Sequence, residues 1–216
     1  MYCQVNGVSL YYEVSGEGTP LLMIHGNSES HEIFDAAIPQ LSRTHRIYAV
    51  DSRCHGKSTK TERIGYDVMA SDLIALIHAL GLHKPLFYGF SDGGILGLLI
   101  AIREPELLGK LIVSGANLNP KGLDLRTRLE TLAVALTGNR LFRMMLREPD
   151  ISPCDLHRIA VPTVVLAGEH DVVRRAHTEL IARSIPGAVL EILPGEDHGS
   201  YIVHSEKLAE ILRKYL

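Results

Sequence analysis

Residues 85–103 of the chain read PLFYGFSDGGILGLLIAIR. Residues 86–88 have an apolar strand pattern, and residues 92–103 continue as an apolar helix. Between them, Gly89, Ser91 and Gly93 form G-x-S-x-G in the strand, turn and helix context that this motif requires. Glycines at the outer positions remove side chains that would collide where strand meets helix. The pattern predicts a tight turn that exposes Ser91 at the carboxyl end of a sheet, over the positive end of a helix dipole.

Short aliphatic runs recur along the chain, and such continuous runs are typical of strands buried on both faces. They lie at Leu21–Ile24, Arg46–Val50, Pro85–Tyr88, Lys110–Val113, Thr163–Ala167 and Val189–Leu193. Helical patterns alternate with them at Asp67–Leu80, after the Ser152-Pro153 pair and at Ser205–Leu216. The Asn6-Gly7 pair before Val8–Val14 favours an opening β-hairpin. The order predicts an α/β fold with a mostly parallel central sheet, an antiparallel N-terminal hairpin and helices on both faces.

Residues 121–150 interrupt this alternation with helical periodicity and no strand. At 216 residues the chain is closer to one domain than to two, since domains average roughly 150 residues. We therefore expect a single domain, 1–216, that carries a short inserted helical cap at 121–150. Packing on the core is the ordinary role of apolar cap residues, and lining of a substrate pocket is the alternative. The candidates for that second role are Leu141, Phe142, Met144 and Met145.

Composition excludes several classes of protein. With 46% hydrophobic and 22% charged residues, the chain is globular rather than disordered. Its formal charge of -3 and the lack of a basic run argue against nucleic acid as a partner. The three cysteines are scattered, no signal-peptide pattern opens the chain, and no apolar stretch is long enough to cross a bilayer. We expect a cytoplasmic protein without a membrane span, and the sequence does not indicate its oligomeric state.

Further motifs accompany the Ser91 turn in a fixed order. Residues 22–27 read LMIHGN, residues 51–58 read DSRCHGKS, and GEHD and DHG occupy 168–171 and 197–199. Together they resemble the α/β-hydrolase fold family, in its small-cap esterase form, over residues 21–199. The resemblance implies a nucleophilic serine, then an acid, then a histidine along the chain. Cys54 stands where the family usually has glycine, so the backbone of that loop is an open question.

A serine nucleophile needs a base and a group that orients the base. His198 is the candidate base, because it alone among 11 histidines follows the last strand in a polar loop before the terminal helix. Other histidines have structural interpretations: His25, His55, His78 and His204. The candidate orienting acid is Asp171, which follows the strand at 163–167. Its competitors are Glu169, Glu196 and Asp197.

The resemblance also implies an oxyanion hole made of two backbone N–H groups. By position in the motifs these belong to Asn27 and to Asp92, the residue after the nucleophile. The GxSDGG form resembles valacyclovir-hydrolase-like members of the family, in which the corresponding acid recognises an amino group of the substrate. Asp92 is accordingly a candidate substrate-binding residue. In the alternative, the Asp92 carboxylate faces away from the pocket and only interacts favourably with the helix dipole.

These features predict a serine hydrolase that cleaves a carboxylic ester of a small molecule through an acyl-enzyme. Within enzymes the alternatives are a C–C bond hydrolase and a cofactor-free perhydrolase, which use similar triads. A ligand-binding or signalling protein that keeps the triad is the alternative of another class. No zinc, dinucleotide or phosphate-loop motif is present. We therefore expect neither a metal nor a cofactor.

Overall fold

An eight-stranded sheet forms the centre of the protein in this computed structural model, which describes residues 1–216. The strands are β1 (Tyr2–Val5), β2 (Val8–Ser15), β3 (Thr19–Ile24), β4 (His45–Val50), β5 (Leu86–Phe90), β6 (Lys110–Ser114), β7 (Thr163–His170) and β8 (Val189–Asp197). Across the sheet they follow the order β1-β2-β4-β3-β5-β6-β7-β8. From β3 to β8 the strands run parallel, whereas β2 pairs antiparallel with β1 and β4.

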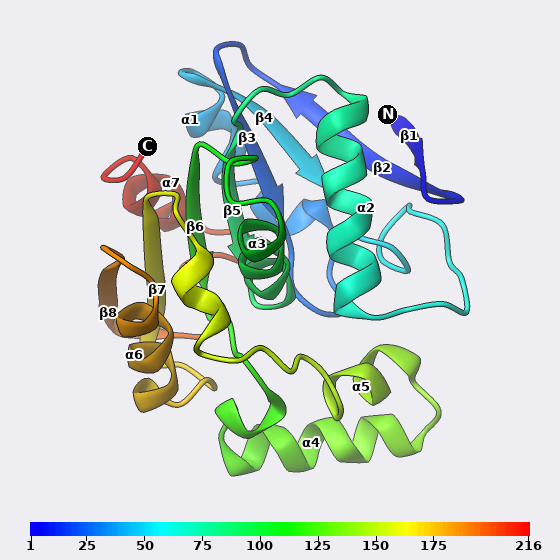
Figure 1. The fold of residues 1–216 in the computed structure, drawn as a ribbon, viewed down its shortest axis with the longest axis vertical. Coiled ribbons are helices and arrows are strands. Elements are labelled where there is room, and N and C mark those ends of the chain that lie inside the picture. The colour runs from blue at the N-terminus through cyan, green and yellow to red at the C-terminus, as the bar shows by residue number, and fades with distance from the viewer.

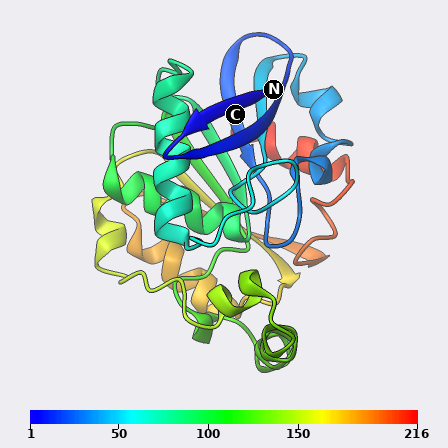
Figure 2. The ribbon, with the colours of Figure 1, turned by 90° about the vertical axis from the view of Figure 1, so that its right-hand side faces the viewer.

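Helices cover both faces of this sheet (Figure 1). They are η1 (His31–Phe34), α1 (Ile38–Leu41), α2 (Tyr66–Ala79), α3 (Asp92–Arg103), η2 (Pro120–Gly122), α4 (Leu125–Leu136), α5 (Arg140–Met145), η3 (Asp155–Arg158), α6 (Arg175–Ser184) and α7 (Lys207–Leu212). One hydrophobic cluster of 35 buried residues lies under α2, α3 and α6. A second cluster of 19 lies under α1 and α7 on the other face, and Figure 2 shows helices on either side of the sheet.

The predicted fold class is confirmed. The hairpin turns at Asn6-Gly7, and both residues have positive φ angles of 48° and 76°. Each of the six predicted strands is present, with ends that differ by a few residues. The predicted helix at 67–80 corresponds to α2. Apolar runs therefore located the sheet correctly, because helices bury it on both faces.

Two predicted helical segments differ from the structure, and one helix was not predicted. After Ser152-Pro153 the chain forms only the short 3-10 helix η3, which begins at Asp155. The C-terminal helix extends from Lys207 to Leu212 rather than from 205 to 216. No helix is predicted at α6, because its buried side mixes apolar side chains with polar ones such as His177 and Thr178. Short helices that depend on tertiary packing give weak periodic signals.

Residues 121–150, which we call the cap, lie between β6 and β7 in the chain and form one end of the molecule, at the bottom of Figure 1. The cap is helical, as its periodicity indicates, and consists mainly of α4 and α5 packed on each other. Side chains fix both helix starts. Asp124 accepts a hydrogen bond from the Thr127 N–H, and Asn139 accepts from the Leu141 N–H.

The orientation of α4 about its own axis is unusual. Thr131 and Ala135 face inward and are each 3% exposed. The leucines of the helix, at 125, 129, 132 and 136, all point outward and are exposed. A surface helix ordinarily buries such a stripe against the core. Periodicity therefore identified the helix but not the face that packs.

Candidate active site

Ser91 lies at the sharp turn between β5 and α3. Its φ of 51° and ψ of -112° place it in a region that residues with a side chain rarely adopt. A Cβ on Gly89 would lie 2.1 Å from the Gly93 carbonyl oxygen, and a Cβ on Gly93 would lie 2.2 Å from that of Ile24. The Ser91 N–H donates to the Ser114 carbonyl at 2.8 Å. Both glycines of the motif are thus required for this turn to close.

The structure brings Ser91, His198 and Asp171 together. The Ser91 hydroxyl lies 3.1 Å from His198 Nε2, and His198 Nδ1 lies 2.8 Å from Asp171 Oδ1. The Asp171 side chain is 2% exposed and the His198 side chain 24%. Asp171 Oδ1 also accepts from the Val173 N–H at 2.8 Å, which fixes the carboxylate. A buried acid, a half-buried histidine and an accessible serine form one continuous chain of hydrogen bonds.

The pairing of β7 with β8 sets the distance between Asp171 and His198. Parallel strands β7 and β8 pair up to His170 and Asp197, across an irregularity in the register near Gly168. Asp171 and His198 are the next residues of the two strands. Gly115, at the end of β6, has a φ of 60°, and a Cβ there would lie 2.6 Å from His198 Cε1. The ring of His198 therefore occupies space that only a glycine leaves open.

The competing carboxylates have other partners. Glu169 accepts from the Gly195 N–H, and Glu196 pairs with Lys207. Asp197 accepts from two backbone N–H groups of the following turn, which lowers the pKa of its carboxyl. None of the three bonds to the His198 ring. Among these four carboxylates, Asp171 is the one that bonds to the ring.

The other histidines occupy structural positions. His25 donates through Nδ1 to the Gly26 carbonyl at 2.7 Å, and its Nε2 accepts from the Ser52 N–H at 3.1 Å. Burial, together with the nearby His55 ring, lowers the pKa of His25 to about 3. His25 is thus a neutral link between the loops after β3 and β4. Exposed His78 and His204 each pair with a carboxylate on the surface.

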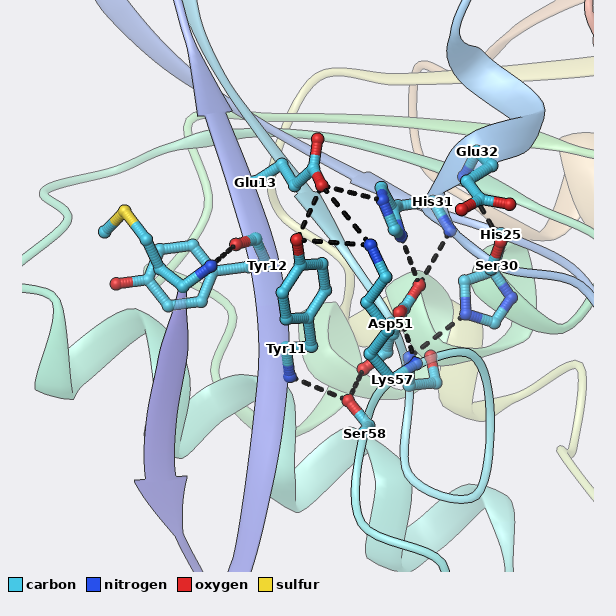
Figure 3. A network of polar contacts seen from close by, with 12 residues as sticks. Tyr11, Tyr12, Glu13, His25, Ser30, His31, Glu32, Asp51, Lys57 and Ser58 are labelled. Carbon is cyan, nitrogen blue, oxygen red and sulfur yellow. Dashed lines mark hydrogen bonds and ion pairs between the residues drawn. The ribbon is translucent and has the colours of Figure 1, made fainter.

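Asp51 ties the same two loops together (Figure 3). Its Oδ1 accepts from both the N–H and Nδ1 of His31, and its Oδ2 accepts from the Lys57 N–H, each at 2.8 Å. His31 Nε2 reaches Glu13 at 3.2 Å. Cys54, in place of the usual glycine, has a φ of 67°, which is the left-handed conformation that glycine adopts most readily. The loop therefore keeps the glycine-type backbone with a side chain present.

Two residues that line the cavity beside Ser91 have backbone N–H groups without an acceptor. The N–H groups of Asn27 and Asp92 make no hydrogen bond within the protein. The Asn27 side-chain amide donates to Asp92 Oδ2 at 3.1 Å, and the Tyr66 hydroxyl donates to Asp92 Oδ1 at 2.7 Å. Burial raises the pKa of Asp92, and these two donors oppose that shift. The two N–H groups predicted to form an oxyanion hole are therefore free of other acceptors.

A cavity of about 410 Å³ opens above Ser91, between the sheet and the cap. Among the residues predicted to line a pocket, Asp92, Phe142 and Met145 line it. Leu141 and Met144 do not: Met144 is 6% exposed and belongs to the main hydrophobic cluster, and Leu141 lies outside the cavity wall. Packing on the core is therefore the role of Met144. A larger, polar crevice of about 710 Å³ beside α2 contains none of these residues.

Several lining residues were not among the predicted ones. Cap residues Thr127, Thr131 and Val134 come from one side of α4, at the spacing of successive helical turns. The remaining unpredicted residues are Gly26, Glu29, Phe90, Asn117, Leu123, Glu130 and Val172. The position of Glu29, two residues after Asn27 in the same loop, was the one available signal. The others depend on how the cap packs.

The cavity wall is lined by carboxyl groups. Glu29, Asp92 and Glu130 line it, no lysine or arginine does, and Glu130 pairs with Arg126 outside the lining at 2.8 Å. Glu29 Oε2 accepts from the Gly26 N–H at 2.8 Å, and burial raises the pKa of its carboxyl. Such a wall disfavours anionic groups on a bound molecule.

None of the helices combines the length and apolar character needed to span a bilayer.

Comparisons with known proteins agree with this geometry. The family model for the alpha/beta hydrolase fold matches residues 19–134, more than half of the chain. Human serine hydrolase BPHL is 27% identical over an alignment that covers 98% of this chain and 84% of that protein. A putative esterase/lipase of Haemophilus influenzae is 26% identical over 90% of this chain and 81% of its own.

Among solved structures, the enzyme Est816, described as degrading N-acyl homoserine lactones, superposes with a TM-score of 0.86 at 24% identity. Each of the two chains is covered completely. At that identity the superposition shows the shared fold alone. The matched family model, the hydrolase relatives and the shared fold lead to one conclusion: this chain belongs to the alpha/beta hydrolase fold family, and it is a hydrolase.

Proposed function

We propose that the chain is a serine hydrolase that cleaves carboxylic esters of small molecules through an acyl-enzyme intermediate. One observation carries the proposal. Asp171, His198 and Ser91 are linked by hydrogen bonds of 2.8 and 3.1 Å at the floor of a cavity. The same floor holds two backbone N–H groups without acceptors. Nucleophile, base, orienting acid and oxyanion donors thus occur in one place.

In the first step the Ser91 hydroxyl attacks the ester carbonyl carbon, and His198 Nε2 accepts its proton. Asp171 accepts the Nδ1–H of His198, which keeps Nε2 free as the base and stabilises the imidazolium that forms. The half-buried position of the ring leaves it within reach of both Ser91 and the leaving group. His198 then returns the proton to the departing alcohol.

The developing oxyanion needs donors that are already in place. The N–H groups of Asn27 and Asp92 supply them, and removal of one such donor typically slows catalysis by about 10²- to 10³-fold. Water then attacks the acyl-enzyme with His198 as base, and Ser91 leaves. The positive end of α3 lies under the oxyanion and adds to its stabilisation.

The cavity wall narrows the substrate class. With Glu29, Asp92 and Glu130 on the wall and no basic residue there, a carboxylate on the substrate would meet like charge. Phe90, Val134 and Phe142 offer apolar surface for the acyl or alcohol part. The preferred substrate is therefore a neutral or amine-bearing ester with an apolar portion.

A pre-steady-state assay on short-chain p-nitrophenyl esters tests the proposal, with Ser91→Ala as the variant. The proposal expects a burst of p-nitrophenol followed by steady turnover, and loss of both in Ser91→Ala. Ser71→Ala, at an exposed serine of α2, is the matched control and keeps full activity. A Ser91-dependent burst without turnover would instead assign a ligand-binding role, and full activity in Ser91→Ala would remove Ser91 from the mechanism.

A further inference from the structure

The outer side of the cap carries a concentrated apolar patch. Leu125, Leu129, Leu132 and Leu136 are 68, 58, 42 and 76% exposed, and they lie on one side of α4. Leu146, directly after α5, adds to the patch. Five of the eight exposed large apolar side chains of the chain are therefore gathered here. In Figures 1 and 2, α4 forms the outer edge of the molecule with no other segment beyond it.

Arginines border these leucines. Arg128 lines the groove between Leu125, Leu129 and Leu146, and Arg143 and Arg147 line the adjoining groove. None of the three arginines forms an ion pair. The cap holds six basic and four acidic residues, against 16 basic and 21 acidic in the rest of the chain. The cap is thus a positive region on a negative protein.

The acidic residues of the cap are mostly engaged elsewhere. Asp124 caps the N-terminus of α4, Glu148 accepts from the Tyr66 N–H, and Glu130 pairs with Arg126 at 2.8 Å. Asp150 lines the crevice beside Arg128 without an ion pair to it. The outer face therefore combines exposed leucines with arginine charges that no carboxylate of the protein neutralises.

We propose that this face, defined by the five leucines and by Arg128, Arg143 and Arg147, docks the protein on an anionic lipid surface. An apolar stripe bordered by arginine is the pattern of a helix that lies in the interface of a membrane. Leucines enter the boundary of the acyl chains, and the arginines meet the negative headgroups. A second copy of the chain fits less well, because pairing of identical faces would bring their unpaired arginines together.

The docked face adjoins the catalytic cavity. The groove on the face has a volume of about 180 Å³, and Leu123, Thr131 and Met145 line both this groove and the cavity above Ser91. Docking would hold that wall against the lipid, so apolar esters dissolved in the membrane would lie next to the reaction site. This consequence rests on the proposed esterase function, whereas the docking itself does not.

Vesicle flotation tests the docking. The probes are vesicles of phosphatidylcholine alone and of phosphatidylcholine mixed with phosphatidylglycerol, and all proteins carry Ser91→Ala so that no lipid is hydrolysed. We expect binding to the anionic vesicles, weakening as salt is raised. Adding Leu129→Gln and Leu132→Gln together should weaken it by roughly tenfold or more. Arg128→Gln with Arg147→Gln should weaken it by a similar factor. Val189→Gln removes an exposed apolar residue of β8 and is the control.

The leucine, arginine and valine positions are all exposed, so each variant should unfold at the same temperature as the Ser91→Ala protein. Matching thermal unfolding curves would show that the variants are folded. Lack of binding to anionic vesicles, or equal binding by the double leucine variant, overturns the docking. Self-association that the leucine changes abolish, without vesicle binding, assigns the face to a second copy and also overturns it. Because flotation uses the Ser91→Ala background, a negative result here leaves the burst experiment unaffected, and the reverse also holds.

Discussion

The side-chain amide of Asn27 donates to the carboxylate of Asp92 at 3.1 Å. These are the same two residues whose backbone N–H groups have no acceptor. One loop follows β3 and the other begins α3, so the side-chain bond fixes the spacing between donors from separate segments. Donors that are held in place before reaction need no reorganisation when charge develops. In the proposed mechanism, this bond preorganises the two oxyanion donors.

Asn27→Ala should lower kcat by about 10- to 100-fold and leave KM nearly unchanged. The backbone N–H stays, but its tether to Asp92 is lost, so stabilisation of the transition state suffers more than ground-state binding. Steady-state kinetics on a short-chain ester measures the two constants. Asn117→Ala, at a cavity residue that bonds only within its own loop, is the control. A rise in KM without a fall in kcat would contradict the positioning role.

Asp92→Asn tests whether this carboxylate recognises an amino group of the substrate. Both of its oxygens already accept hydrogen bonds, from Tyr66 and Asn27. We therefore expect kcat/KM to fall by a similar factor for an amino-acid ester and for a plain acyl ester. The ratio of the two values is the measurement. A selective loss of roughly tenfold or more for the amino-acid ester would establish amine recognition by Asp92.

Asp171→Asn should reduce kcat by roughly 10⁴-fold, because an amide that donates to His198 Nδ1 favours the wrong tautomer of the ring. Asp197→Asn is the matched control at the adjacent carboxylate. Its Oδ1 still accepts the two backbone N–H groups of the following turn, so activity should stay within about tenfold of the parent. Comparable losses in the two variants would show that Asp171 is not the orienting acid.

Gly115→Ala should lower activity because the new Cβ would lie 2.6 Å from His198 Cε1 and displace the ring. Gly81→Ala controls for backbone strain alone: its φ is 61°, against 60° at Gly115, and no atom lies within 4 Å of a Cβ there. Each change costs about 1–2 kcal/mol of stability from the left-handed backbone. Only Gly115→Ala should also reduce kcat, measured on folded protein. Equal kcat values in both variants would refute the steric argument.

The neutral state of His25 predicts a pH dependence of stability. Its pKa is about 3 in the folded protein and ordinarily 6.5. Between these values the unfolded chain binds a proton at this position that the folded protein does not, so stability is full above pH 6.5 and falls as pH drops towards 3. The slope from this one group is at most about 1.4 kcal/mol per pH unit.

Urea unfolding at several pH values between 7 and 4 measures this slope. His25→Asn should flatten it, although the variant is less stable overall because one of the two hydrogen bonds of the ring is lost. His78→Gln replaces an exposed histidine and should leave the slope unchanged. An unchanged slope in His25→Asn would mean that His25 does not carry the effect.

The sheet and its catalytic edge were predictable from the sequence because their signals are local. Apolar runs such as Leu21–Ile24 reflect burial on both faces, and Gly89-x-Ser91-x-Gly93 reflects the steric demands of one turn. The order of Ser91, Asp171 and His198 along the chain follows from strand order in the family. Each of these signals needs only neighbouring residues or a resemblance to be recognised.

The cap was only partly predictable because its signals are not local. The leucine pattern shows that α4 is a helix, but rotation about its axis decides whether leucines or threonines face the cavity, and packing sets that rotation. Met144 packs in the core, the ordinary role of such a residue, whereas Phe142 and Met145 of the same apolar segment line the cavity. Glu130 reaches the cavity from a position with no motif of its own.

Acid and base leave the sheet as the next residues after the paired His170 and Asp197 of adjoining strands. Their separation is therefore set by strand register and not by residues 121–150, which enter the chain between β6 and β7. The residues proposed for the reaction and the cap that lines the cavity thus come from separate stretches of chain. A change in the length of the cap would leave the spacing of Asp171 and His198 to the sheet.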